Sequence, residues 1–226
     1  MKHIPLFDSN RLLTAILGYG FMLVLIIISV NFWDRTIADA MHAHGYSGTL
    51  LKLLSQIPTV LEVIAAVFIM SVFIKRSRER FSSLMINLIA TIALASLVRV
   101  SAKIAFGRTW PETWVNDNPS WINNGLEAFH PFAQGIAYNS FPSGHALFTF
   151  SLATVFWYHF PRLRPVWLAC MLGVLIGQVG LNYHFLGDLL AGATLGTFIA
   201  HMVILGSNKA NSIKKLNRKP RPASST

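Results

Sequence analysis

The sequence predicts an all-α integral membrane protein, a bundle of six membrane-spanning helices, and three observations support this. Hydrophobic residues make up 53% of the 226 residues and charged residues only 12%, against roughly 25% charged in an ordinary soluble domain. Six apolar stretches each approach the ~20 residues that a helix needs to cross a bilayer. The basic residues gather in short clusters between these stretches. The single cysteine, Cys170, excludes a disulfide framework and a cysteine-based zinc site.

The six spans are expected at about 12–32, 56–74, 83–101, 142–160, 166–183 and 186–205. The first is too long for a signal peptide, and no small-residue cleavage pattern follows it. The second contains Glu62 and the third contains Arg99, and we expect these two side chains to pair inside the bundle, as intramembrane charges usually do. Two Gly-x-x-x-Gly pairs, at 173–177 and 192–196, predict close helix packing.

The basic residues predict the orientation, because Lys and Arg stay preferentially on the cytoplasmic side. Fourteen of the 19 fall on one side of the topology: Lys2, Arg11, Lys75, Arg76, Arg78, Arg80, Arg162, Arg164, Lys209, Lys214, Lys215, Arg218, Lys219 and Arg221. Both termini are therefore expected in the cytoplasm, and the protein in the plasma (inner) membrane. Residues 1–208 then form one membrane domain, and 209–226 a disordered basic tail that contacts anionic lipid. The clustering of the basic residues between apolar spans argues against nucleic acid as a partner. The oligomeric state remains open.

Three polar segments converge on the outer, periplasmic side of this topology, where chemistry is expected. They read KIAFGRTWPETW (103–114), SFPSGHA (140–146) and NYHFLGDLLAG (182–192). Polar groups at such positions are costly unless they serve a site or a water-filled cavity.

The PSGH sequence stands at the start of the fourth span. Pro142 suits a first helical turn, and Ser143 and Gly144 offer a hydroxyl and uncovered N–H groups at the positive end of the helix dipole. Such a helix start binds anions, phosphate in particular. His145 can hold or release a proton near neutral pH. A serine cap beside an incidental interfacial histidine is the alternative interpretation.

His184 and Asp188 stand four residues apart, so that a helix places both on one face. A carboxylate that accepts a hydrogen bond from one imidazole nitrogen leaves the other nitrogen free as a nucleophile. Alternatively, Asp188 caps the sixth span and His184 is an interfacial side chain.

Lys103 in KIAFGRTWP, the SFPSGH segment and His-x-x-x-Asp at 184–188 occur in this order across the predicted spans. Together they resemble the type 2 phosphatidic acid phosphatase superfamily, whose fold is shared with vanadium-dependent haloperoxidases. The resemblance covers about residues 80–205, and the family's motifs are K-x6-R-P, P-S-G-H and S-R-x5-H-x3-D.

The resemblance implies a role for each matched residue. His184 would attack phosphorus and form a phosphohistidine, with Asp188 orienting its ring. His145 would protonate the leaving lipid oxygen and later activate water. The phosphoryl oxygens would be held by Lys103, Ser143 and the Gly144 N–H. Because phosphoryl transfer needs mainly positioning and charge neutralisation, this cradle is expected to work without a metal or another cofactor.

Two phosphate-binding arginines of the family motifs are replaced. Trp110 stands where the first motif has its arginine, and Gln178 stands where the third motif has its own. Arg108 is the expected substitute, because Gly107 can let the backbone fold back toward the start of the fourth span. Arg99, one turn before Lys103, is a second candidate.

The expected function is therefore that of a membrane lipid phosphatase acting on a lipid phosphomonoester or diphosphate at the outer face. Undecaprenyl pyrophosphate, phosphatidylglycerophosphate, phosphatidic acid and lipid A phosphate all remain open as substrates. Three alternatives also remain: a lipid-to-lipid phosphotransferase, a non-catalytic lipid-binding relative, and a transporter with midplane charges at Glu62 and Arg99.

Overall fold

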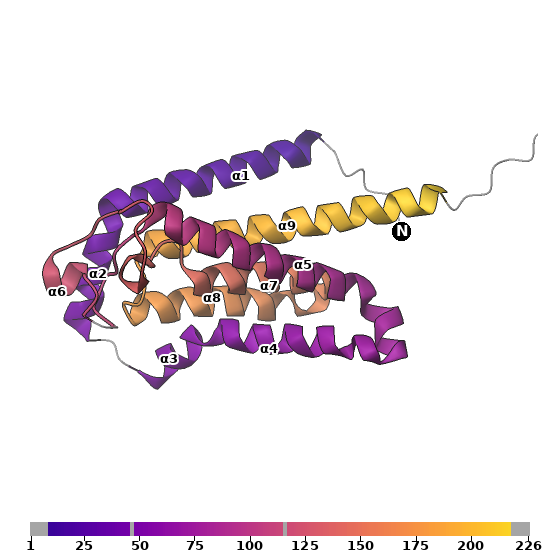
Figure 1. Ribbon diagram of the computed structural model, residues 1–226, viewed down its shortest axis with the longest axis horizontal. Coiled ribbons are helices and arrows are strands. Elements are labelled where there is room, and N and C mark those ends of the chain that lie inside the picture. Colours follow the sequence, from indigo (N-terminus) through magenta and orange to yellow (C-terminus); the bar gives the residue numbers. More distant parts are fainter. Residues whose placement is uncertain (1–8, 46–47, 115–116, 218–226) are drawn as a thin grey trace, which may run out of the picture.

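The computed structural model describes residues 9–45, 48–114 and 117–217, and these fold into helices with no β-strand among them (Figure 1). The predicted all-α class is thus confirmed. The helices are α1 (Ser9–Ile28), α2 (Asp34–His44), α3 (Thr49–Ser55), α4 (Ile57–Met70), α5 (Lys75–Phe106), α6 (Trp121–Asn124), α7 (Gly144–His159), α8 (Arg164–Gly180) and α9 (Leu186–Asn217). A π-helical turn, Ser29–Trp33, connects α1 directly to α2.

Within the described ranges, four helical segments are long and apolar enough to cross a membrane: Leu12–His44, Lys75–Phe106, Pro161–Gly180 and Leu186–Ile213. The pair Thr49–Ser55 and Ile57–Phe73 makes a fifth if its 41° bend lies within one span. The sixth expected span, 142–160, corresponds to α7, which has 16 residues. Length and hydropathy therefore support four or five spans, and the sixth depends on α7.

Helix α7 lies inside the bundle and packs against α5, α8 and α9 (Figure 1). Ten of its 16 residues are buried, and Leu147, Leu152 and Phe156 have no exposed surface. Because neighbouring helices cover it, α7 does not need the length of a lipid-facing helix to bury its apolar side chains. The core of the bundle is therefore built around the helix that carries the PSGH sequence at its start.

Glycines bring α9 against α7, as the Gly-x-x-x-Gly pattern at 192–196 predicts. A Cβ built on Gly192 would lie 2.4 Å from the Ser143 carbonyl oxygen, and one on Gly196 would lie 2.3 Å from that of Leu147. No side chain fits at such distances, so the expected close packing is confirmed. Gly177 makes the same kind of approach from α8, since its Cβ would lie 2.5 Å from the Ser55 nitrogen.

The C-terminal segment differs from its prediction. Helix α9 continues to Asn217, so that 209–217 are helical rather than disordered. Residues 218–226 of the expected tail lie outside the described residues.

Candidate active site

The loop after α5, the start of α7 and the turn before α9 meet at one end of the bundle, which we call the site end (Figure 1). Gly107 ends α5 in the left-handed conformation, with φ at 58°, which is the usual way for a helix to stop at a glycine. A Cβ on Gly107 would lie 1.9 Å from the His130 carbonyl oxygen. The loop therefore turns back at once and crosses the site end.

Ser143 caps the start of α7, and its Oγ accepts a hydrogen bond from the Ala146 N–H at 3.4 Å. Its own N–H donates to the Asp188 carbonyl oxygen at 3.0 Å, which ties the start of α7 to α9. The N–H groups of Gly144 and His145 lie in the first turn, where a helix provides no acceptor. Among the described residues nothing else accepts from them. The start of α7 thus presents two N–H donors at the positive end of the helix dipole.

His184 lies in the turn before α9 and is 4% exposed. Its Nδ1 lies 3.4 Å from the Asp188 Oδ2. The same oxygen accepts hydrogen bonds from the Ser140 Oγ at 2.5 Å and from the Phe185 N–H at 3.2 Å. Asp188 therefore caps the start of α9 and also faces the histidine ring.

The structure brings Lys103 and His145 to the same place as His184. The rings of His145 and His184 lie 6.2 Å apart between centroids, and His145 is the exposed one. The Lys103 Nζ donates a hydrogen bond to the Asn139 carbonyl oxygen and lies 5.6 Å from the Trp110 ring. That indole in turn lies 5.1 Å from the His184 ring.

A cavity of about 220 Å³ opens beside these residues. Its lining residues come from α5 and the loop that follows: Arg99, Lys103, Trp110, Trp114, Asn118, Ile136 and Asn139. Two cations, two indole rings and two amides therefore surround a space next to the histidine pair.

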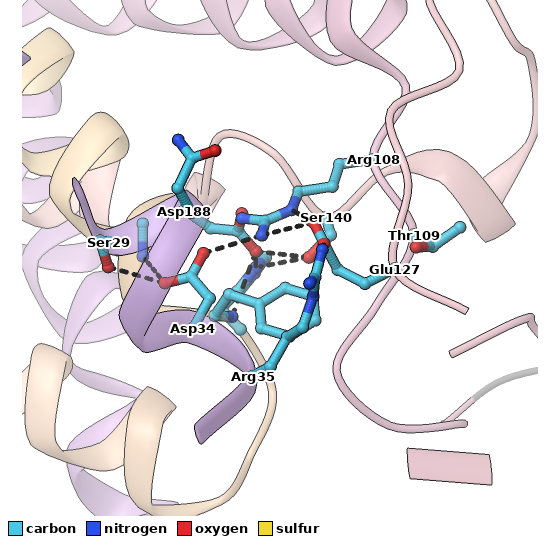
Figure 2. A network of polar contacts seen from close by, with 12 residues as sticks. Ser29, Asp34, Arg35, Arg108, Thr109, Glu127, Ser140 and Asp188 are labelled. Carbon is cyan, nitrogen blue, oxygen red and sulfur yellow. Dashed lines mark hydrogen bonds and ion pairs between the residues drawn. The ribbon is translucent and has the colours of Figure 1, made fainter. Parts of the chain in front are cut away.

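Arg108 does not line this cavity, in contrast to its expected role as a phosphate ligand. Its side chain has no exposed surface, and its guanidinium lies among three carboxylates (Figure 2). The Nη1 donates to the Asp188 Oδ1 at 2.6 Å, and the Nη2 lies 2.7 Å from the Glu127 Oε1 and 2.8 Å from the Asp34 Oδ2. The fold-back at Gly107 does occur, but it turns Arg108 to the far side of Asp188.

Arg99 lies closer to the start of α7 than the sequence suggested. A Cβ on Gly144 would lie 2.8 Å from the Arg99 Nε, so the guanidinium covers the first turn of α7. The expected ion pair between Arg99 and Glu62 is absent, because no carboxylate of the described residues lies within 4.0 Å of Arg99. Its guanidinium is instead 6.0 Å from the Phe148 ring and lines the cavity.

Gln178, in the position of the other missing arginine, lies away from the cavity. It is fully buried against α3, where its Nε2 donates to the Ser55 carbonyl oxygen at 3.5 Å. An arginine here would have to be buried between α8 and α3. Of the three side chains considered as substitutes, the structure thus places Arg99 alone in the cavity lining.

The surroundings of His184 and Arg108 set their charge. Burial lowers the pKa of His184 below its ordinary value of about 6.5, and Asp188 partly opposes this by raising the pKa. The positive charges of Lys103 and Arg108 lower the pKa further. Burial would also lower the pKa of Arg108, but its carboxylate neighbours outweigh this and raise it. At neutral pH, His184 is therefore a free base and Arg108 a cation.

The family model for the PAP2 superfamily matches residues 84–212, which contain every residue of the cavity and of the histidine pair. The chain belongs to the PAP2 superfamily. Lipid A 1-phosphatases of Rhizobium etli and Rhizobium johnstonii are each 25% identical over 148 residues, or 63% of this chain. The "Probable lipid phosphate phosphatase 4" of Arabidopsis thaliana is 31% identical over 126 residues, or 44% of this chain and 40% of that protein.

The matched segment spans about three fifths of each Rhizobium protein, at 61% and 58% of their lengths. No solved structure matches this chain. The family is therefore established by sequence, and the substrate is a separate question.

Three polar residues at the site end of this PAP2 chain were not singled out from the sequence as site residues: Asp34, Glu127 and Ser140. Asp34 and Glu127 are buried and contact Arg108, and Ser140 donates to Asp188. Asp34 lies before the matched segment and Glu127 lies in a loop without a motif. For Asp34 and Glu127 the sequence signal is an acidic charge on the side where the motifs converge, and Ser140 stands in the 140–146 segment itself.

Proposed function

We propose that this chain is a membrane lipid phosphatase that hydrolyses a lipid phosphomonoester or diphosphate through a phosphohistidine on His184. The observation that carries the proposal is the pairing of a buried histidine with an exposed one. The two rings lie 6.2 Å apart, beside a helix start whose first N–H groups have no acceptor among the described residues. Nucleophile, acid–base group and anion site are then within one small region.

In the first step, the nitrogen of His184 that faces away from Asp188 attacks phosphorus. The bond from phosphorus to the leaving oxygen breaks, and His145 gives its proton to that oxygen. The leaving oxygen is the lipid oxygen of a phosphomonoester or the bridging oxygen of a diphosphate. In the second step, His145 takes a proton from water, whose oxygen attacks phosphorus. The nitrogen–phosphorus bond breaks, inorganic phosphate leaves, and His184 returns to its neutral form. Asp188, 3.4 Å from the His184 Nδ1, stabilises the positive charge that the ring gains in between.

The phosphoryl oxygens are held by the start of α7 and by two side chains of α5. The Gly144 N–H and the Ser143 hydroxyl lie at the start of α7, where they can donate hydrogen bonds to phosphoryl oxygens. Lys103 and Arg99 line the cavity beside them. We assign to Arg99 the work of the family's missing arginine, because it has no carboxylate partner among the described residues and its Nε lies next to Gly144. Arg108, with three carboxylates around it, is not available to substrate.

We further propose that the site faces the outer (periplasmic) side, that both termini are cytoplasmic, and that α7 is the sixth span. The bias of Lys and Arg supports the orientation. The position of α7 between longer helices supports its crossing, since lipid does not have to match its length. A lipid phosphate in the outer leaflet is then the natural substrate, and lipid A 1-phosphate belongs among the candidates because two relatives carry that name.

A phosphate-release assay on a lipid panel tests the proposal. Purified protein is incubated with lipid A 1-phosphate, undecaprenyl pyrophosphate, phosphatidic acid and phosphatidylglycerophosphate, and His184→Ala is the matched control. We expect release from at least one lipid by the wild type, none by His184→Ala, no effect of EDTA, and inhibition by vanadate, which mimics the five-coordinate transition state. Phosphate release by His184→Ala at the wild-type rate would refute the assigned nucleophile. Transfer of phosphate to a second lipid instead of water would identify a phosphotransferase.

A further inference from the structure

Asp34 stands at the first position of α2, directly after the π-helical turn, and is 1% exposed. Its Oδ1 accepts hydrogen bonds from the Ser29 Oγ at 2.7 Å and from the Gly187 N–H at 2.8 Å. Its Oδ2 lies 2.8 Å from the Arg108 Nη2. A residue of the N-terminal helices therefore contacts both the first turn of α9 and the buried arginine.

Arg108 connects Asp34 to the catalytic pair. It lies between the Phe185 and Phe129 rings, at 4.3 and 5.0 Å from their centroids. Its Nη1 donates a hydrogen bond to the Oδ1 of Asp188 (Figure 2). The Oδ2 of Asp188 faces His184. A guanidinium binds carboxylates in a planar fork and fixes their orientation. The orientation of Asp188 therefore depends on where Arg108 is held, and Asp34 is one of the groups that hold it.

The charges of this cluster do not cancel. Asp34, Glu127 and Asp188 face one buried guanidinium, and the second arginine in the cluster, Arg35, is half exposed and contacts Glu127 alone of the three. Three carboxylates with one buried and one half-exposed arginine leave a net negative charge in the cluster beside His184. The His184 ring becomes positive when its nitrogen bonds to phosphorus, so this charge stabilises the ring in the intermediate more than in the free enzyme.

We infer that Asp34 is a positioning residue of the proposed phosphatase reaction, which acts on His184 through Arg108 and Asp188. The inference rests on the proposed function for its effect on turnover. It also gives the N-terminal helices, which precede the matched segment at 84–212, a part in the chemistry. Without the carboxylate of Asp34, Arg108 draws Asp188 toward itself and away from the histidine ring.

The first test compares Asp34→Asn with the matched control Asp39→Asn. Asparagine keeps an acceptor for the Ser29 hydroxyl and the Gly187 N–H but removes the charge beside Arg108. Asp39 lies on the same helix, is exposed, and accepts a hydrogen bond from the Trp121 Nε1 at 2.7 Å without contacting Arg108. We expect kcat to fall about 10- to 100-fold in Asp34→Asn, as for small misplacements of catalytic groups, with KM almost unchanged. Asp39→Asn should match the wild type.

The second test reads the His184 ring itself and does not need turnover. The charged and titratable groups that face His184 are Asp188 on α9, Lys103 on α5, Arg108 in the loop and His145 on α7. In Asp34→Asn, Arg108 is less neutralised, so the His184 ring should titrate at a lower pH than in the wild type. Histidine ¹⁵N spectra show this, with His184→Ala identifying the resonance. An inactive wild type would refute the proposed function and still leave this titration to decide the inference.

A third test separates the charge of Asp34 from its cap on α9. Glu127→Gln removes a carboxylate from Arg108 and leaves the contact of Asp34 with Gly187 intact. Like Asp34→Asn, it should lower kcat and lower the pH at which the His184 ring titrates. Arg108→Gln should make Asp34→Asn nearly silent, because two residues that act through one contact are not additive. Unchanged kcat and unchanged titration in Asp34→Asn would overturn the inference. If Asp34→Asn does not fold, an unchanged titration in Glu127→Gln would overturn it instead.

Discussion

At the scale of single residues, the site depends on where each cation finds its counter-charge. Arg108 and Arg99 both flank Lys103 in the sequence, and spacing alone favoured Arg108 as the phosphate ligand. The structure gives the two arginines different surroundings. Arg108 forms ion pairs with Asp34 and Glu127, whereas Arg99 has no carboxylate partner among the described residues. A motif can be found from residue order, whereas the partner of a cation is decided by distant segments that fold against it. Residue order therefore groups the two histidines with Asp188, whereas the carboxylates around Arg108 come from segments that carry no motif.

Arg99 gives the first prediction. If its guanidinium holds a phosphoryl oxygen, Arg99→Ala should lower kcat/KM by roughly 10- to 100-fold, since a hydrogen bond to a charged group contributes about 1.5–3 kcal/mol. Arg99→Lys should recover part of the loss, because an ammonium keeps the charge without the fork. The yield and melting temperature of both variants should stay near the wild type, since no ion pair is broken. A loss of folded protein with normal specific activity would instead assign Arg99 to the bundle.

His184 gives a prediction of pH dependence. Burial depresses its pKa below about 6.5, and Asp188 opposes this depression. The ring should therefore remain neutral at pH 6.5 and take up a proton only as the pH falls further. Asp188→Asn removes the opposing charge, so the titration should move to still lower pH. Histidine ¹⁵N spectra measured between pH 4 and 8 check the direction, and a midpoint above 6.5 in the wild type would contradict it.

His145 gives a third prediction at this scale. It is the exposed member of the pair and serves both half-reactions in the proposed mechanism. His145→Ala should slow phosphohistidine formation on a lipid alkoxide, and much less on a substrate whose leaving group needs no proton. Hydrolysis of the intermediate should stay slow in both cases, so the phosphoenzyme should accumulate with the second substrate. Rapid-quench measurement of protein-bound phosphate distinguishes the two steps. Equal losses on both substrates, with no accumulation, would argue against this role.

At the scale of elements, the helices could be predicted from their apolar runs, but their ends and joins could not. The expected span at 83–101 is the middle of α5, which extends from Lys75 to Phe106. The expected span at 12–32 continues through a π-helical turn into α2. Hydropathy reports the length of an apolar run, and it does not report whether a helix continues once the chain becomes polar. The turn at Ser29–Trp33, which brings Asp34 to Arg108, has no signal in such a pattern.

The contact between α7 and α9 gives a prediction about stability. Gly196→Ala places a Cβ 2.3 Å from the Leu147 carbonyl oxygen, so the two helices must separate. Overpacking of this kind costs about 1–3 kcal/mol. The melting temperature of detergent-solubilised protein should fall, and activity should fall with it, because Ser143 and Asp188 lie on these two helices. Gly206→Ala is the matched control on α9, since nothing lies within 4 Å of its Cβ. Equal melting temperatures for the two variants would contradict the packing argument.

At the scale of the whole molecule, the family and the all-α class can be predicted from the sequence, whereas the number of membrane spans is harder to predict. Among the described residues, four or five segments satisfy length and hydropathy. Helix α7, with 16 residues, is too short for that criterion and is surrounded by other helices. A criterion of length and hydropathy does not count a short helix that lies inside its own bundle, whether or not that helix crosses the membrane. An even number of spans places both termini on the same side of the membrane, and an odd number places them on opposite sides. The side on which the C-terminal segment lies therefore distinguishes five spans from six.

Cysteine labelling decides the topology. The natural thiol is first removed by Cys170→Ser, and one exposed cysteine is then introduced by Glu79→Cys, at the start of α5, or by Gln134→Cys, in the loop after α5. In spheroplasts, a membrane-impermeant maleimide should label Gln134→Cys at once and Glu79→Cys only after lysis, because the basic residues around Glu79 favour the cytoplasm. A third variant, Ser207→Cys in the C-terminal half of α9, reports the parity. Six spans place Ser207 on the side of Glu79, so both should need lysis. Labelling of Ser207→Cys in intact spheroplasts, with Glu79→Cys protected, would mean that one expected helix does not cross.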